Sequence, residues 1–181
     1  MEGKMRKTLV YICLMLALST TSANALDATD VSIAGIDEES NLVEIEESLE
    51  GYIFKSDNGY PEFDVDRAQA DGASDFALSV GKALNQVSTE YAERDNNRVS
   101  RGMPGYKRWC GPGNSGPGAP VNTLDRLCMH HDKCYARKGY FNCSCDRELL
   151  AGINRDYNRM VGFEKVMANA IKVYFTHAPC R

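Results

Sequence analysis

The sequence predicts a mainly α-helical, small and disulfide-rich fold, and three observations lead to this class. Apolar residues recur at helical spacing in several segments. The chain of 181 residues carries seven cysteines, which is many for its length. Hydrophobic residues make up 43% of the chain, enough for a packed core and too many for a disordered protein.

Residues 1–25 have the three parts of a secretory signal peptide. A basic start is followed by an apolar run from Thr8 to Leu18 and by the small-residue site Ala23-Asn24-Ala25. The run is shorter than the roughly 18 residues that a membrane anchor needs, and its flanks disfavour a buried helix. We therefore expect a secreted, extracellular protein.

Cleavage after Ala25 would remove Cys13 and leave an even set of cysteines. These are Cys110, Cys128, Cys134, Cys143, Cys145 and Cys180. In an oxidising compartment, six cysteines indicate three disulfides. Zinc binding is the alternative, since two histidines lie between Cys128 and Cys134, but the chain has no C-x-x-C pair.

Residues 26–101 form an acidic pro-segment or N-terminal extension. They contain 18 Asp and Glu against 6 Lys and Arg, a net charge of −12. The part from Leu26 to Arg67 shows no sustained periodicity, so we expect it to be largely flexible. While attached, its charge would partly neutralise a basic surface on the residues that follow.

One amphipathic helix is predicted in this segment, over residues 75–93. The apolar positions that recur there at helical spacing are Phe76, Val80, Leu84, Val87 and Tyr91. Two interpretations stay open at this point. The helix belongs either to a removable segment or to the folded domain, on which it would pack.

The sequence Arg98-Val99-Ser100-Arg101 has the R-x-x-R pattern that proprotein convertases cut. Two solvated arginines in an exposed loop are the alternative interpretation. A cut after Arg101 would leave a domain of residues 102–181, with 12 Lys and Arg against 6 Asp and Glu, a net charge of +6. The whole chain has a net charge of −4 and a pI near 5.4, so we expect no nucleic-acid partner.

The domain after Arg101 contains a shaped loop and three predicted helices. Residues 109–118 are too rich in Gly and Pro for a helix or a central strand. Helices are predicted over residues 124–137, with Asn122 or Thr123 as N-cap, over residues 146–160 and over residues 163–175.

The residues with the most reactive chemistry lie on the first two of these helices. His131 and Asp132 are neighbours on the first helix, about 100° apart around its axis, and can flank one groove. Tyr135 lies four residues from His131 and shares its face. Asp146 begins the second helix, directly after two cysteines.

These segments together resemble the secreted phospholipase A2 superfamily. The resemblance rests on the loop Trp109-Cys110-Gly111-Pro112-Gly113, on the Cys128-to-Tyr135 stretch with its C-x-x-H-D-x-C pattern, and on Cys143-Ser144-Cys145-Asp146. The short loop is closest to the bee-venom-like branch. The resemblance implies two antiparallel, disulfide-linked catalytic helices and a calcium-binding loop.

The resemblance also implies a Ca²⁺ site. Its ligands would be the carbonyl oxygens of Trp109, Gly111 and Gly113 and the carboxylate of Asp132. Calcium prefers six to eight hard oxygen ligands, and glycines let a backbone turn its carbonyls inward.

The implied catalytic residues are His131, Asp146 and Tyr135. His131 would be the general base that activates water, and its ordinary pKa near 6.5 suits this role. Asp146 would orient the imidazole, and Tyr135 would hydrogen-bond the Asp146 carboxylate. The implied disulfides are Cys110–Cys128 and Cys134–Cys145, which leaves Cys143–Cys180 by elimination.

The function expected from this resemblance is a secreted, calcium-dependent phospholipase A2 that hydrolyses the sn-2 ester of glycerophospholipids. Its partner would be a phospholipid membrane surface or micelle, which it would bind peripherally through the basic domain. The alternative is a non-catalytic phospholipase A2-like ligand, toxin or matrix-binding protein on the same scaffold.

Overall fold

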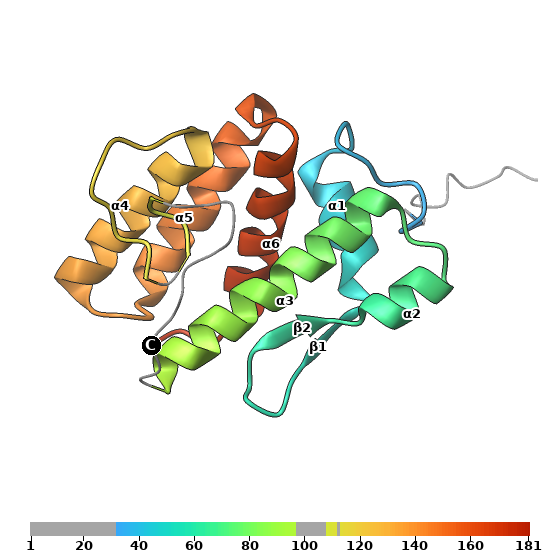
Figure 1. The fold of residues 1–181 in the computed structure, drawn as a ribbon, viewed down its shortest axis with the longest axis horizontal. Helices are drawn as coiled ribbons and strands as arrows, with labels where there is room; N and C mark the ends of the chain where they lie inside the picture. The colour runs from blue at the N-terminus through green and yellow to red at the C-terminus, as the bar shows by residue number, and fades with distance from the viewer. Residues whose placement is uncertain (1–31, 97–107, 112) are drawn as a thin grey trace, which may run out of the picture.

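The computed structural model describes residues 32–96, 108–111 and 113–181 (Figure 1). The predicted signal peptide and the Arg98-to-Arg101 pattern lie outside these residues. The described elements are α1 (Leu42–Glu50), β1 (Ile53–Lys55), β2 (Pro61–Phe63), α2 (Val65–Ala70), α3 (Asp75–Asp95), α4 (Thr123–Lys138), α5 (Cys143–Asp156), the short 3-10 helix η1 (Tyr157–Arg159) and α6 (Phe163–His177). The mainly helical, disulfide-rich class is confirmed.

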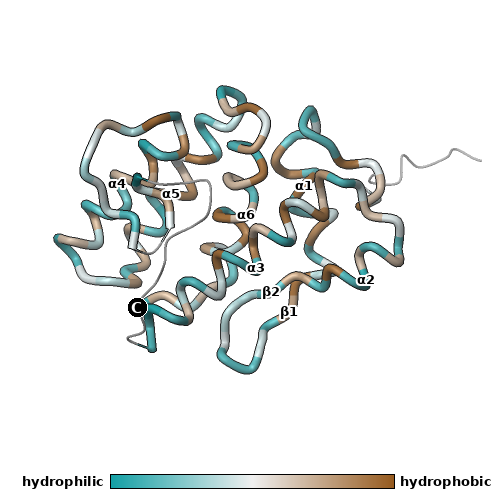
Figure 2. The backbone as a smooth tube through the Cα atoms, viewed as in Figure 1, coloured by the Kyte–Doolittle hydropathy of each residue, from teal (hydrophilic) through white to brown (hydrophobic). Residues whose placement is uncertain are grey.

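Helix α6 is the central element, because it is covered on every side. All ten residues from Val166 to Phe175 are buried, and all but Asn169 and Lys172 are hydrophobic. It contacts α1, α3 and α5, and hydrophobic residues run along both α6 and α3 (Figure 2). The core of the molecule therefore forms around α6.

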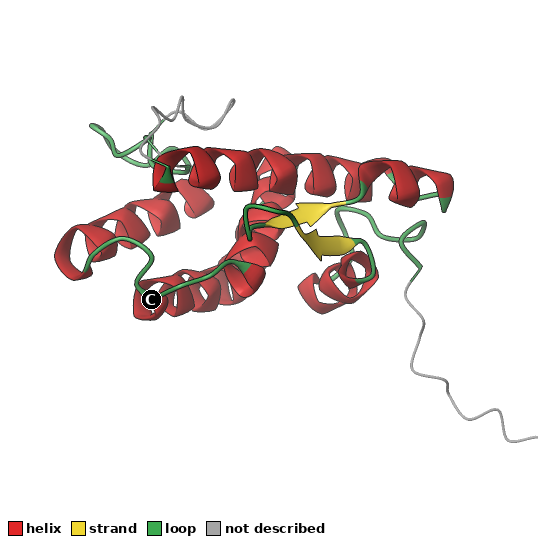
Figure 3. Ribbon diagram, turned by 90° about the horizontal axis from the view of Figure 1, so that it is seen from below, coloured by secondary structure: helices red, strands yellow, loops and turns green. Residues whose placement is uncertain are grey.

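Helix α3 is the helix predicted over residues 75–93, and it packs along α6. It spans Asp75–Asp95 and lies across the other helices (Figure 3). The ring of Tyr91 stacks on Tyr174 at 4.6 Å between centroids and meets Phe175 edge-on at 5.4 Å. One hydrophobic cluster runs from Ile33 to Phe175, so this helix belongs to the folded domain.

The prediction that Leu26–Arg67 is largely flexible is wrong for residues 32–67. They form α1, the antiparallel β1–β2 pair and the start of α2. Ile45 and Leu49 of α1 are buried, and Asn41 and Glu44 form a capping box at its start. These elements are too short to give a sustained periodicity. Their few apolar residues nevertheless pack into a core that residues later in the chain complete.

The acidic segment pairs with α6 and with the residues just after it. Lys172 pairs with Glu46, His177 lies 3.3 Å from Glu50, and Asp95 lies 3.7 Å from Arg181. Within the described residues, no ion pair joins this segment to α4 or α5. The described pairs therefore lie at α6 and just after it, and neutralisation of a basic surface by the acidic segment stays a prediction.

The two predicted catalytic helices are α4 and α5, with small differences in their bounds. Asn122 is the N-cap of α4, where its side chain accepts from the Asp125 N–H at 2.8 Å. Helix α5 begins at Cys143 instead of Asp146, because the Asn142 side chain caps it by accepting from the Ser144 N–H. No helix of the described residues is long and apolar enough to cross a membrane.

Gly81 of α3 lies against the ring of Phe63 in β2. An added Cβ at Gly81 would come within 2.1 Å of Phe63 Cδ1, whereas one at Gly51 would meet nothing within 4 Å. We expect Gly81→Ala to lower the free energy of unfolding by about 1–3 kcal/mol, because overpacking outweighs the better helix propensity of alanine. Urea unfolding measures the change, with Gly51→Ala as the matched control. Equal stabilities of the two variants would contradict this packing.

A chain that starts at Gly102 tests whether the acidic segment is needed for the fold. Without α1 and α3, the buried faces of α6 become exposed, so we expect this fragment to bind a hydrophobic dye and to aggregate. The chain that starts at Leu26 should remain soluble and dye-free. Size-exclusion chromatography and dye fluorescence measure both properties. A soluble fragment that unfolds cooperatively at the same urea concentration would contradict the shared core.

Candidate active site

Helices α4 and α5 lie side by side and antiparallel (Figure 1), and their contact brings His131 and Asp146 together. The Cys134–Cys145 disulfide joins the two helices, with the Cα atoms 5.7 Å apart. His131 Nε2 lies 2.8 Å from Asp146 Oδ1, and the two residues are only 5% and 6% exposed. A buried carboxylate without a partner would be costly, and His131 supplies that partner.

The Asp146 carboxylate determines which nitrogen of the His131 imidazole carries the proton. Because an ionised carboxylate only accepts hydrogen bonds, Nε2 carries the proton and Nδ1 keeps its lone pair. The Tyr135 hydroxyl donates a hydrogen bond to the same Asp146 oxygen. Burial, and then this hydrogen bond, raise the pKa of Tyr135 well above its ordinary value, so the hydroxyl remains a donor. The ring of His131 also meets Tyr135 and Phe175 at centroid distances of 4.1 and 4.8 Å.

The predicted calcium loop is fixed to α4 by a buried aspartate. Asp125 is 0% exposed, and its Oδ1 accepts from the backbone N–H groups of Trp109 at 3.0 Å and Cys110 at 3.3 Å. Its Oδ2 accepts from Val121 N–H at 3.0 Å. The Cys110–Cys128 disulfide joins the same loop to α4. Asp125 therefore positions the loop beside His131.

The loop has the backbone conformation that its glycines permit. Gly111 and Gly113 have φ angles of 94° and 88°, a region that other residues rarely adopt. The Gly111 carbonyl accepts one hydrogen bond, from Asn114 N–H at 3.1 Å, and keeps a second lone pair. Trp109 is held by its indole N–H, which donates to the Gly118 carbonyl at 2.9 Å.

Asp132 has the features of a cation ligand. Its Oδ2 is buried and has no hydrogen-bond partner among the described residues. Burial raises the pKa of Asp132 to about 7, against the opposing effect of Arg94. A bound cation would satisfy this oxygen, so the residue fits a Ca²⁺ ion. The described residues contain no cluster of three His, Cys, Asp or Glu side chains for a metal, and such a site would therefore need backbone carbonyls.

Most of the predicted site residues line one small cavity. It is lined by Trp109, Gly111, Cys128, His131 and Asp132, together with Val87, Tyr91, Leu149, Ile171 and Phe175. Its volume of about 10 Å³ leaves room for about one water molecule. Gly113 is exposed and does not line the cavity. Asp146 and Tyr135 do not line it either, but both contact His131.

The structure forms the three disulfides that the resemblance implies, including the pair left by elimination. They are Cys110–Cys128, Cys134–Cys145 and Cys143–Cys180. Each of these cysteines is therefore unavailable as a zinc thiolate.

The sequence analysis missed Asp125 and the apolar wall of the cavity. An aspartate in the first turn of a helix is usual, and nothing in its spacing marks Asp125 as the acceptor of three loop N–H groups. Val87 and Tyr91 belong to a predicted amphipathic face. Their position beside His131 follows only from the packing of α3 on α6.

Curated proteins match part of the chain. The acidic phospholipase A2 homolog taipoxin gamma chain of Oxyuranus scutellatus scutellatus is 43% identical over 51 residues, 28% of this chain and 31% of the relative. Phospholipase A2-delta of Arabidopsis thaliana is 41% identical over 69 residues, 33% and 36% of the two chains. Phospholipase A2 homolog 3 of Oryza sativa subsp. japonica is 43% identical over 53 residues, 28% and 32% of the two chains.

These matches confirm the resemblance to the secreted phospholipase A2 superfamily. The alignments span about a third of the length of each of these relatives. No protein-family model matches the chain, and no solved structure matches it significantly.

The pKa of Asp132 predicts a pH dependence of stability in calcium-free protein. The pKa is about 7 in the folded protein against an ordinary 3.8, so between these values the folded state keeps a proton that the unfolded chain has lost. The free energy of unfolding should therefore fall as the pH rises from 4 to 7, by about 1–3 kcal/mol. Asp132→Asn stays neutral and should flatten this part of the profile.

Urea unfolding in chelator, at about pH 5 and about pH 8, measures this difference. Asp57→Asn is the matched control, since Asp57 is exposed in the turn between β1 and β2. Parallel pH profiles for Asp132→Asn and the unaltered chain would contradict the burial of an unpartnered carboxylate.

Proposed function

We propose that this chain is a secreted, calcium-dependent phospholipase A2 that hydrolyses the sn-2 ester of glycerophospholipids. The observation that carries the proposal is the convergence of His131, Asp132 and the Gly111 loop on one cavity. The base, its orienting carboxylate and a partnerless ligand oxygen are then all present within one site.

In the proposed reaction, His131 Nδ1 takes a proton from a water molecule, whose oxygen attacks the sn-2 carbonyl carbon. Asp146 holds the imidazole through Nε2 and stabilises the imidazolium that forms. Tyr135 keeps the Asp146 carboxylate in place. His131 then returns the proton to the departing glycerol oxygen.

The carbonyls of Trp109, Gly111 and Gly113 and the carboxylate of Asp132 would bind Ca²⁺. When bound, the ion supplies positive charge to the lipid phosphate and to the oxygen of the carbonyl under attack. The Gly111 N–H would donate a hydrogen bond to the same oxygen.

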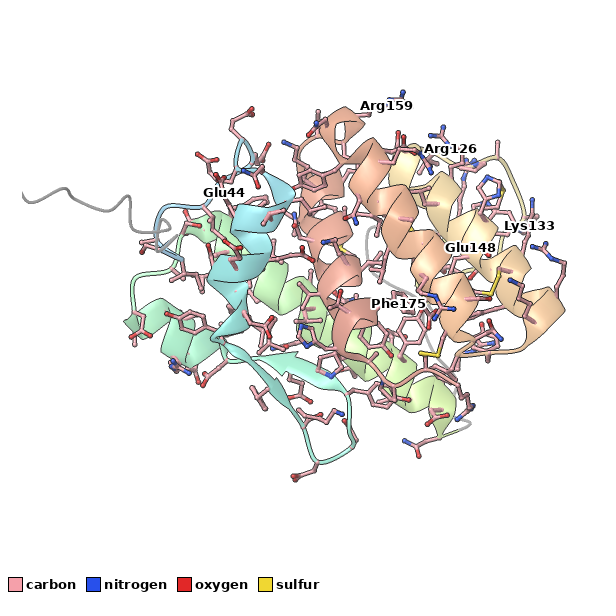
Figure 4. All side chains as sticks on the ribbon, turned by 180° about the vertical axis from the view of Figure 1, so that it is seen from behind. Glu44, Arg126, Lys133, Glu148, Arg159 and Phe175 are labelled. Atoms are coloured by element: carbon pink, nitrogen blue, oxygen red, sulfur yellow. A yellow bond between two sulfur atoms is a disulfide. The ribbon has the colours of Figure 1, made fainter. Side chains whose placement is uncertain are left out.

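The proposed partner is an anionic phospholipid surface. Basic residues line the outer sides of α4 and α5, and Arg126 and Lys133 project there away from the core (Figure 4). The exposed residues of this basic surface are Arg126, Lys133, Arg137, Lys138, Arg147 and Arg155. Each basic residue near an anionic surface contributes about 1 kcal/mol to binding.

A non-catalytic phospholipase A2-like ligand, toxin or matrix-binding protein is the second candidate function. Two observations favour it. Two of the matching relatives bear the word "homolog" in their names, and the cavity beside His131 has a volume of only about 10 Å³.

Release of the sn-2 fatty acid from mixed vesicles, with calcium and with chelator, separates the two functions. We expect calcium-dependent release by the secreted chain and a loss of about 10²–10⁴-fold in His131→Gln, because the general base is removed. His130→Gln is the matched control, since its side chain is the exposed neighbour on α4. A folded chain without turnover on any vesicle composition would exclude the enzyme. Equal losses in the two variants would contradict the role of His131.

A further inference from the structure

Large hydrophobic side chains are exposed around the starts of α4 and α6. Val121, just before α4, is 61% exposed, Val161, just before α6, is 74% exposed, and Phe163, the first residue of α6, is 55% exposed. Single exposed apolar residues are usual on a protein surface, whereas a group of them marks a contact site. What these side chains can do therefore depends on whether they lie together.

Hydrogen bonds join the starts of the two helices. The Leu124 N–H donates to Glu164 Oε1 at 2.7 Å, and the Glu164 N–H donates to the Val161 carbonyl at 3.1 Å. Leu124 lies three residues after Val121, and Glu164 directly follows Phe163. The three apolar residues therefore belong to neighbouring segments. We call Val121, Val161 and Phe163 the apolar edge.

The Asp125 carboxylate joins this apolar edge to the proposed calcium loop. Its Oδ2 accepts from the Val121 N–H, while its Oδ1 accepts from the N–H groups of Trp109 and Cys110. Trp109 also lines the cavity that contains His131. A surface that binds the apolar edge would therefore lie next to the loop of the proposed active site.

Arginines border the apolar edge. Arg159 lies two residues before Val161 and is exposed, and Arg126 projects from the same end of the molecule (Figure 4). A hydrogen bond from Arg155 lowers the pKa of Asp156. The charges of Arg159 and Arg126 act in the same direction, so these two guanidinium groups lie near the same carboxylate.

The acidic side chains of this region are turned into the protein. Asp125 and Asp156 are buried, and Glu164 accepts from the Leu124 N–H. The positive charge of Arg126 and Arg159 is therefore the charge that this end of the molecule presents to solvent beside the apolar edge.

The acidic turn of residues 37–39 contacts α6 on another side. Lys165 donates to the Glu38 carbonyl of this turn. Lys165 follows Phe163 by two residues, which is about 200° around the helix axis. The acidic turn and the apolar edge therefore face different directions.

We propose that the apolar edge inserts into the interface of a phospholipid membrane, and that Arg126 and Arg159 bind the lipid phosphates around it. The proposal rests on the proposed lipid substrate and names the residues that hold the chain on its surface. Exposed apolar side chains beside basic ones are the combination that binds a membrane interface. A second copy of the chain fits less well, because two such edges would bring their arginines together.

Vesicles of ether-linked phosphatidylcholine and phosphatidylglycerol test this proposal without hydrolysis, because these lipids have no sn-2 ester. We expect Val121→Ser and Val161→Ser each to lower the vesicle affinity, measured by co-sedimentation in chelator, about three- to tenfold. This is the effect of one or two apolar groups that no longer leave water. Phe163→Ala should lower the affinity at least as much.

Val43→Ser and Phe54→Ala are the matched controls. Val43 of α1 is 60% exposed and Phe54 of β1 is 46% exposed, so the same substitutions remove similarly exposed side chains from the acidic segment. We expect neither control to change the vesicle affinity. Equal losses in Val43→Ser and Val121→Ser would overturn the apolar edge.

Arg126→Gln and Arg159→Gln test the basic border. Each should lower the affinity for vesicles that contain phosphatidylglycerol about fivefold, the contribution of one basic residue at an anionic surface. The affinity for pure phosphatidylcholine should change less. Unchanged binding of the anionic vesicles by both variants would contradict the role of the arginines.

Two further measurements separate this proposal from its alternatives. If size-exclusion chromatography shows a dimer that Val161→Ser dissociates, and the unaltered chain binds no vesicles, the edge joins two copies and the membrane proposal is wrong. Weaker vesicle binding by Val121→Ser, without sn-2 hydrolysis of ester lipids by any variant, keeps the membrane edge and excludes the enzyme. Calcium-dependent hydrolysis, with equal vesicle affinity in Val121→Ser and the unaltered chain, keeps the enzyme and excludes the edge.

Discussion

The whole structure depends on one constraint, the need to cover α6, a mainly apolar helix that is buried on every side. Helix α6 buries ten successive residues, and α4 and α5 cannot surround it alone. Helices α1 and α3 of the acidic segment complete the cover. The same packing brings Val87 and Tyr91 beside His131, so the acidic segment is at once part of the core and part of the wall of the site.

Three aspartates on α4 and α5 have buried carboxylate oxygens, and they differ in the hydrogen-bond partners of these oxygens. Asp125 accepts from three backbone N–H groups and orders a loop. Asp146 accepts from His131 and Tyr135 and orders an imidazole. Asp132 keeps an oxygen without a protein partner. Because a buried polar group normally finds a partner, this contrast separates the two carboxylates that accept from groups of the protein itself from the one suited to an external ligand.

The sequence predicted the local features and missed those that depend on distant residues. The helix over 75–93 follows from periodicity, and the His131–Asp146 pair is implied by the resemblance to the secreted phospholipase A2 superfamily; the structure has both. The sequence predicts Leu26–Arg67 as flexible because the segment is acid-rich and shows no sustained periodicity. The order of residues 32–67 comes from distant helices, since α1 packs on α6 whereas β2 and α2 pack on α3. No local pattern carries that information.

The position of α6 in the chain also determines when the molecule can fold. It follows every other described element, yet α1 and α3 pack directly against it. During synthesis, the early helices therefore leave the ribosome well before α6. Their apolar faces stay exposed to solvent until α6 has been made. Such long-range contacts slow folding and expose intermediates to aggregation. The first half of this chain is therefore exposed to aggregation until the second half has been made.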